Sequence, residues 1–179
     1  MSVSGLQVLL AGQPVSVEPL TTEAFKPFGD VIEASDSTHH FSINQGFAER
    51  FHRLAHVDVT QDGGQPTISI FIAKARPLPL QLNLLEKHPF GSQAFMPLSG
   101  HAYLVVVALG GDTPDMSTLK CFSATAQQGV NYAKGTWHHP LLALQDGDFL
   151  VVDRTGPVGE VNCVEFRLDA SKAFKSTTG

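Results

Sequence analysis

Short apolar stretches separated by turn residues run along the whole chain. Several alternate between apolar and polar positions with a period of two, and in one of them Ile68, Ile70 and Ile72 fall on one face. Alternation of this kind is typical of half-buried strands. The expected strands are residues 28–34, 41–44, 51–59, 67–75, 78–85, 102–109, 119–122, 149–153 and 161–168. Many short strands at such regular spacing predict an all-β barrel or sandwich.

Helical periodicity is rare in this sequence. The best candidate is Thr22 to Lys26, which Pro27 stops after about one turn, and we expect one or two such short helical turns. We find no internal repeat and no linker that would divide the chain. The expectation is therefore a single domain over residues 1–179, with an N-terminal arm at 1–16 and a polar tail at 170–179.

Composition narrows the possible partners and the compartment. The chain has 179 residues, 42% of them hydrophobic and 16% charged, which excludes disorder for most of its length. A net charge of −5 argues against binding nucleic acid, and the longest uncharged apolar run, 102–109, is too short to span a membrane. Cys121 and Cys163 lack CxxC spacing, so we expect two reduced, buried thiols in a cytoplasmic protein.

The first cluster with chemical potential begins at Glu86 and His88. These two residues are separated by one position, so on a strand their side chains share a face. Gln93 and Gly100 follow at a spacing that resembles the first cupin motif, HxH(x)3–4E(x)6G, with Glu in place of the first His and Gln in place of the Glu. Because an amide oxygen is a weak ligand, the group either binds a metal loosely or contacts only substrate.

A second cluster contains His138 and His139. The segment Gly135 to Pro140 resembles the core of the second cupin motif, PxGxxH, with Ala133 where proline is expected. Adjacent strand residues face opposite ways, so His138 is expected inside, and His139 lies either outside or at the rim, turned by Pro140.

Together the two clusters predict a divalent metal site. Its expected ligands are Glu86, His88, Gln93 and His138. Imidazole and carboxylate ligands suit first-row ions such as Ni, Mn, Fe or Zn. The alternative is that the histidines only form hydrogen bonds in the core.

Asp153 and Arg154 end an apolar run and allow two interpretations. They are an ordinary ion pair at a strand edge, or Arg154 binds a substrate carboxylate through its planar guanidinium. The sequence has no GxSxG, P-loop or GxGxxG motif, so nothing supports serine-hydrolase, nucleotide or dinucleotide chemistry.

Longer phrases resemble the ureidoglycolate lyase family. The match extends from about residue 17 to residue 166. Its phrases include LEKHPFGSQAF (85–95), QGVNY (128–132) and WHHPL (137–141), and the last of these is the most specific. The resemblance implies a cupin-like β-barrel, a homodimer, and cleavage of (S)-ureidoglycolate to glyoxylate and urea in allantoin catabolism. Two alternatives remain: a ureidoglycolate hydrolase that releases ammonia and carbon dioxide, and a non-catalytic cupin that binds a small hydroxy or keto acid.

The residues suit that elimination. In ureidoglycolate one carbon bears a hydroxyl, a carboxylate and the ureido nitrogen, so the reaction must move a proton from the hydroxyl to the departing nitrogen. A metal chelated by hydroxyl and carboxylate lowers the hydroxyl pKa, a histidine moves the proton, and the ureido carbonyl stays away from the metal, which favours urea as product. The expected catalytic residues are His138, His139 and Tyr132. The expected substrate-binding residues are Arg154, Arg50, Asn44 and Lys134.

Overall fold

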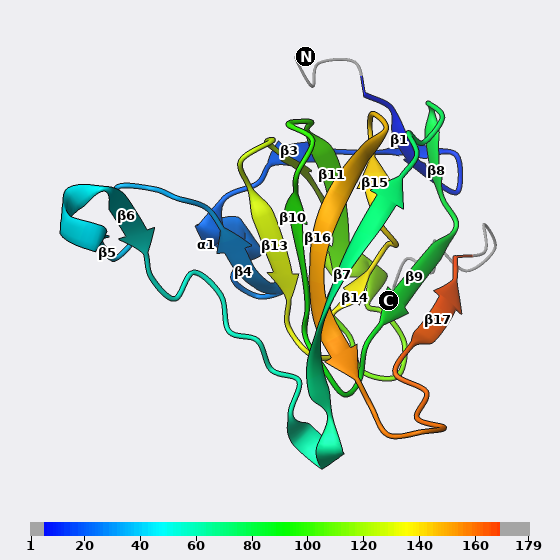
Figure 1. The fold of residues 1–179 in the computed structure, drawn as a ribbon. Helices are drawn as coiled ribbons and strands as arrows, with labels where there is room; N and C mark the ends of the chain where they lie inside the picture. Colours follow the sequence, from blue (N-terminus) through cyan, green and yellow to red (C-terminus); the bar gives the residue numbers. More distant parts are fainter. Residues whose placement is uncertain (1–5, 169–179) are drawn as a thin grey trace.

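Two large sheets that face each other make up the body of the structure, a computed structural model in which residues 6–168 are described (Figure 1). The five-stranded sheet is antiparallel and comprises, in spatial order, β4 (Gly29–Ile32), β13 (Gly129–Tyr132), β10 (Gln93–Pro97), β16 (Gly147–Thr155) and β7 (Gln65–Ala73). The seven-stranded sheet comprises β17 (Val164–Arg167), β9 (Leu84–Lys87), β14 (Trp137–His138), β11 (Tyr103–Ala108), β12 (Lys120–Ala124) and β3 (Val17–Pro19), with β15 (Leu142–Ala143) also paired to β11.

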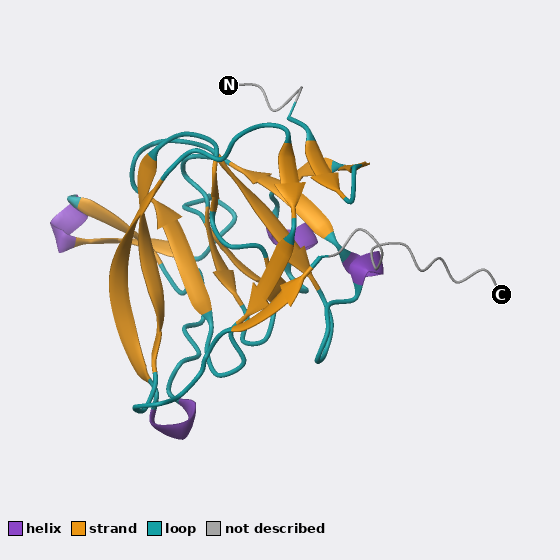
Figure 2. Cartoon of the chain, turned by 90° about the vertical axis from the view of Figure 1, so that its right-hand side faces the viewer, coloured by secondary structure: helices purple, strands orange, loops and turns teal. Residues whose placement is uncertain are grey.

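Smaller elements surround these sheets (Figure 2). A three-stranded sheet contains β2 (Gln13–Val15), β1 (Val8–Leu10) and β8 (Leu80–Leu82), and a hairpin is formed by β5 (His40–Ile43) and β6 (Ala48–Phe51). The helical turns are α1 (Thr22–Phe25), η1 (Asn44–Gly46), η2 (Gln61–Gly63) and η3 (Met116–Thr118).

Strand β11 is buried on both faces. Val105 and Val107 contribute to the core between the two large sheets, whereas Leu104 and Val106 contribute to a second core beneath the three-stranded sheet. A strand with apolar neighbours on both sides reads as an uninterrupted apolar run, which explains residues 102–109. The core between the sheets leaves room at one end for polar side chains, and these form the site described below.

The predicted all-β class is confirmed, and the expected barrel takes the form of two facing sheets. Among residues 6–168 no strand pairing joins the five-stranded sheet to the seven-stranded one. The helical turn at Thr22 is also confirmed: α1 begins after Thr21, whose hydroxyl accepts a hydrogen bond from the Ala24 amide at 3.2 Å, and three 3-10 turns were not expected. The expected polar tail, 170–179, lies outside the described residues.

Several details differ from the sequence expectations. Residues 8–15 of the expected N-terminal arm pair as β1 and β2, with Val8 buried. The expected strand 51–59 ends at Phe51, and residues 52–59 form no strand. Strands β10 and β13 were missed because β10 offers only three apolar residues between Gln93 and Pro97, and Asn131 interrupts β13. Cys121 is buried as expected, but Cys163 is exposed, since β17 lies at the edge of its sheet.

The isoleucines of β7 face away from the core. Ile68 and Ile72 are 73% and 76% exposed, and Ile70 is 53% exposed. The period of two was predicted correctly, but β7 is the edge strand of its sheet and no described element of this chain covers that face. The β5–β6 hairpin also stands apart from the two large sheets in both views (Figures 1 and 2). No described helix is long and apolar enough to cross a lipid bilayer.

Candidate active site

Three side chains converge between the two large sheets: Glu86, His88 and His138. Each offers one ligand atom, and these atoms lie within 4.8 Å of one another. Their convergence follows from strand register, because His138 on β14 pairs directly with Glu86 on β9. Leu85 points into the second core, so Glu86 points the opposite way, into the space between the sheets. The Glu86 Oε1 to His138 Nε2 distance is 3.5 Å.

Backbone carbonyls orient both imidazoles. The Nδ1 atom of His138 lies 2.9 Å from the Thr136 carbonyl oxygen, and that of His88 lies 2.6 Å from the Asn162 carbonyl oxygen. A carbonyl can only accept, so each Nδ1 carries the hydrogen and each Nε2 of a neutral ring keeps a free lone pair. Both Nε2 atoms are buried without a hydrogen-bond partner among the described residues. Two such nitrogens beside a carboxylate are a donor set that fits a first-row divalent ion.

The charge on Glu86 is maintained despite its burial. Desolvation raises the pKa of this carboxyl, but its contact with His138 and the proximity of His88 outweigh that effect and hold the pKa below its usual value. The thiol of Cys163 donates to Glu86 Oε2 at 3.8 Å. Desolvation, followed by the charge of Glu86, raises the pKa of this thiol to about 11, so it stays protonated at neutral pH.

Tyr132 supports the ring of His138. The two rings are stacked with centroids 4.1 Å apart and planes 12° from parallel. Burial, and then the charge of Glu86, raises the pKa of Tyr132 far above its usual value, so its hydroxyl keeps its proton. Gln93 on β10 pairs with Tyr132 on β13 and faces the same interior. Its Nε2 donates to Asp153 at 3.4 Å, and its Oε1 is buried without a partner among the described residues.

His139 is 5% exposed, so it does not lie in solvent outside the sheets. Its Nδ1 is 2.8 Å from the Pro140 carbonyl oxygen. Desolvation lowers its pKa, and the hydrogen bond to Pro140 only partly opposes this. Both Glu86 and Arg76 lie within electrostatic range of this ring. His139 is therefore a neutral imidazole beside the cluster.

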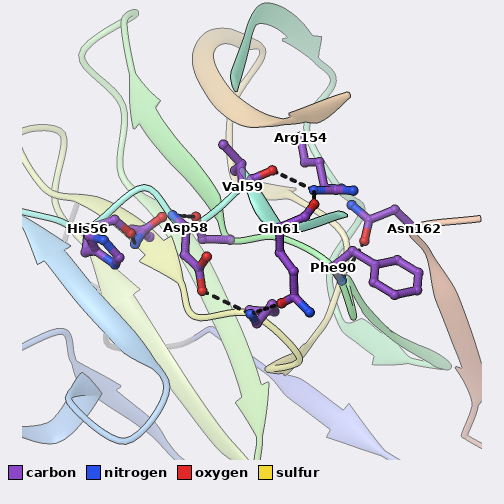
Figure 3. Close-up of polar contacts among 10 residues, drawn as sticks. His56, Asp58, Val59, Gln61, Phe90, Arg154 and Asn162 are labelled. Atoms are coloured by element: carbon purple, nitrogen blue, oxygen red, sulfur yellow. Dashed lines mark hydrogen bonds and ion pairs between the residues drawn. The ribbon is translucent and has the colours of Figure 1, made fainter. Parts of the chain in front are cut away.

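Arg154 lies on the opposite face of its strand from the cluster. Val151 of β16 packs into the core between the sheets, so Arg154, three positions on, points to the other face. Its Nε and Nη2 donate to the two oxygens of Glu160 at 2.9 and 2.7 Å, and its Nη1 donates to the carbonyls of Val59 and Gln61 (Figure 3). The guanidinium is thus bound within the protein, and the expected carboxylate contact does not fit this position.

Gly64 and Gly91 make the space for that guanidinium. A Cβ at Gly64 would lie 1.6 Å from Arg154 Nη1, and one at Gly91 would lie 2.9 Å from Arg154 Cβ. Arg154 therefore fastens the segment around Val59 to β16, a structural role.

The other expected substrate-binding residues also lie away from the cluster. Lys134 binds Gln61 Oε1 at 2.8 Å and Asp58 Oδ2 at 3.3 Å. Asn44 and Arg50 belong to the projecting β5–β6 hairpin. The structure therefore brings Glu86, His88 and His138 together and leaves these three cations and Asn44 outside.

Comparison with known proteins identifies the family. A family model described as ureidoglycolate lyase matches residues 12–175. The chain belongs to the ureidoglycolate lyase family. A ureidoglycolate lyase of Pseudomonas syringae pv. tomato is 52% identical over 143 residues, which cover 79% of this chain and 84% of the relative. One of Burkholderia cepacia is 51% identical over 170 residues, which cover 93% of each chain.

Among solved structures, Bacillus subtilis oxalate decarboxylase aligns with 84% of this chain and 30% of its own, with 11% identity and a TM-score of 0.38. This likeness is too distant to assign chemistry.

Sequence reasoning overlooked three features of this ureidoglycolate lyase family member. The motif spacings identified Glu86, His88 and His138, but no pattern indicated that Asn162 and Cys163 reach the cluster from the loop before β17. The stack of Tyr132 on His138 depends on two strands in different sheets. Contacts of this kind depend on tertiary register, for which a single sequence contains no local signal.

Proposed function

We propose that the protein cleaves ureidoglycolate to glyoxylate and urea at the cluster of Glu86, His88 and His138. The observation that supports this most directly is the pair of buried Nε2 atoms, of His88 and His138, which have no hydrogen-bond partner within residues 6–168 and lie close to the carboxylate of Glu86. Buried polar atoms without partners are rare, and at a functional site they indicate a missing ligand. The family relationship supplies the substrate and the reaction class.

Glu86, His88 and His138 would hold a divalent ion such as Ni, Mn or Zn. Gln93 would add a neutral oxygen, because its buried Oε1 also lacks a partner among the described residues. When bound, such an ion lowers the pKa of a coordinated substrate hydroxyl. The carboxylate of Glu86 and the Nε2 atoms of the two imidazoles are ligand types that suit such an ion.

The remaining steps fall to residues beside the cluster. His139, a buried neutral imidazole, takes the hydroxyl proton as the O–H electron pair forms the aldehyde C=O bond. The C–N bond breaks with its electron pair on the ureido nitrogen, and the proton is delivered there, which completes urea. Tyr132 keeps the ring of His138 in place by stacking and holds its own proton throughout.

Metal reconstitution tests this assignment. After chelation and dialysis, the protein is titrated with Ni²⁺, Mn²⁺ or Zn²⁺ while glyoxylate and urea are measured. Activity is expected to depend on one of these ions, and His88→Ala should lose both metal binding and activity. His56→Ala is the matched control, because His56 is exposed and lies outside the cluster. Full activity of the metal-free protein would instead make Glu86 and Gln93 hydrogen-bonding groups for substrate.

We also propose that two copies associate through the outer face of β7, in a reducing compartment such as the cytoplasm. The three exposed isoleucines form an apolar stripe, and the β5–β6 hairpin presents Phe47, 91% exposed, without covering by its own chain. Exposed apolar patches and lone hairpins are typical of interfaces. Light scattering is expected to give a dimer that Ile70→Lys dissociates and that Val158→Lys, a substitution on another exposed loop, leaves intact. A monomeric wild type would contradict the proposal.

A further inference from the structure

An open cavity of about 690 Å³ lies beside the segment that follows His139. It is bordered by the end of β7, the segment after it, and the two residues that follow His139. The residues that line it include Phe71, Lys74, Arg76, Pro140 and Leu141. Cavities that bind small molecules have volumes of roughly 300–1,000 Å³. The cavity is therefore large enough for a substrate the size of ureidoglycolate.

A row of packed aromatic rings extends from the cavity wall to the cluster. Phe71 in the cavity wall lies against Phe95 at 5.7 Å between ring centroids, and Phe95 lies against Tyr132 at 6.0 Å. Tyr132 in turn stacks on His138. Leu141 packs against the same core. Along the chain only His139 separates His138 from Pro140 in the cavity border, so the cavity adjoins the segment that carries His139. Arg76 in the cavity border and Glu86 in the cluster both lie within electrostatic range of the His139 ring.

A cation suits a substrate carboxylate, and the cations expected from the sequence lie away from the cluster. Of the two cations that border the cavity, Lys74 pairs with Asp146 at 2.8 Å. No other side chain within residues 6–168 forms a hydrogen bond or ion pair with the guanidinium of Arg76. Its backbone is nonetheless fixed, because the Arg76 amide donates to the Ala143 carbonyl at 2.9 Å.

We propose that Arg76 binds the carboxylate of the substrate in this cavity and directs the hydroxyl-bearing carbon toward Glu86, His88 and His138. Arginine suits this role because its planar fork can bind both carboxylate oxygens. The ligands selected are small 2-hydroxy and 2-oxo acids, glyoxylate among them. This inference rests on the proposed function for its substrate.

The test compares Arg76→Ala with Lys74→Ala in the metal-loaded protein. Lys74 borders the same cavity but has a carboxylate partner, so its loss controls for a general change in positive charge. For Arg76→Ala we expect kcat/KM to fall about 10- to 30-fold, the lower part of the range for charge-assisted hydrogen bonds, because the side chain is exposed to solvent. Arg76→Lys should restore part of the activity, and Lys74→Ala should stay within about threefold of the wild type.

A second measurement distinguishes recognition of the substrate carboxylate from a structural effect of the substitution. The wild type should prefer ureidoglycolate over its carboxamide analogue, and Arg76→Ala should lose most of that preference; glyoxylate should inhibit the wild type more strongly than the variant. An Arg76→Ala variant that keeps the wild-type preference and glyoxylate inhibition would overturn the inference and leave the proposed function intact. If the wild type releases no glyoxylate, the proposed function fails, and the affinity of glyoxylate for the wild type and for Arg76→Ala, measured by calorimetry, still decides the role of Arg76.

Discussion

Asn162 offers a sharp test of how the metal ligands are held. Its carbonyl oxygen accepts the Nδ1 hydrogen of His88 at 2.6 Å, and its side-chain Oδ1 accepts from the Phe90 amide at 2.9 Å. The side chain thus fastens the loop that follows His88 to the segment whose backbone orients that imidazole. Figure 3 shows Asn162 beside Phe90. Asn162→Ala removes the hydrogen bond to the Phe90 amide, and the carbonyl that accepts from His88 is then no longer held in position.

The expected magnitudes differ for stability and for metal affinity. The lost hydrogen bond leaves the Phe90 amide unpaired, which costs about 1–3 kcal/mol of unfolding free energy. Removing the group that orients a metal-binding histidine typically reduces metal affinity 10- to 100-fold, or about 1.4–2.7 kcal/mol. Asn162→Ala keeps the carbonyl but frees its segment, so we expect a loss toward the lower end of this range. The affinity should therefore fall even under conditions where the variant is fully folded.

The assay is calorimetric titration of the chelated protein with Ni²⁺, Mn²⁺ or Zn²⁺, with unfolding by urea measured in parallel. Asn162→Asp keeps an acceptor for the Phe90 amide and should bind metal with an affinity close to that of the wild type. Asn83→Ala, an exposed asparagine just before β9, should change neither quantity. Wild-type metal affinity in Asn162→Ala, together with the expected loss of stability, would refute the idea that this clamp positions His88 as a ligand.

Two further predictions concern stability. Phe25→Ala should lower the unfolding free energy by about 3–5 kcal/mol in urea titrations, because Phe25 is 0% exposed and contacts Phe28, Phe122 and Tyr132; a loss below about 1.5 kcal/mol would contradict this packing. Glu160→Gln should lower Tm at neutral pH, because the hydrogen bond from Arg154 holds the pKa of Glu160 below its usual value. A carboxyl whose pKa is lower in the folded than in the unfolded state stabilises the fold above the unfolded pKa of about 4.3, and this stabilisation is lost as the pH falls through the folded pKa. Calorimetry should therefore show that the Tm difference between wild type and variant shrinks in acid. A Tm difference that does not change with pH would contradict the pairing.

The sequence predicted those parts of the structure that depend on local spacing. Glu86 and His88 were placed on one face because strand residues alternate, and the run at 102–109 indicated a buried strand; both are local properties. Whether a given strand face turns toward the core or toward solvent depends on tertiary packing and not on local sequence. The isoleucines of β7 alternate as a core strand would, yet they point outward, because their partners on β16 alternate with the core residues Phe149 and Val151 and lie on the opposite face.

The contacts of the arginines show even more clearly what local sequence cannot predict. Arg154 stands beside Asp153 in sequence, but its partner is Glu160 on the following loop, and two carbonyls from residues 59 and 61 complete its binding. Arg76 lies just before Pro77 and Pro79, which signal a turn, and it belongs to no motif, so only its position in the cavity border makes it a candidate. Long-range pairing of this kind decides which arginine is available to a substrate.

The most direct test of the central claim is a product assay on the purified, metal-loaded protein. Ureidoglycolate is supplied as the sole substrate, and glyoxylate, urea and ammonia are measured in parallel without urease. We predict glyoxylate and urea in equal amounts, no ammonia, and loss of both products in Glu86→Gln. Stoichiometric ammonia without urea would contradict the elimination and assign the cluster to hydrolysis of the ureido carbonyl.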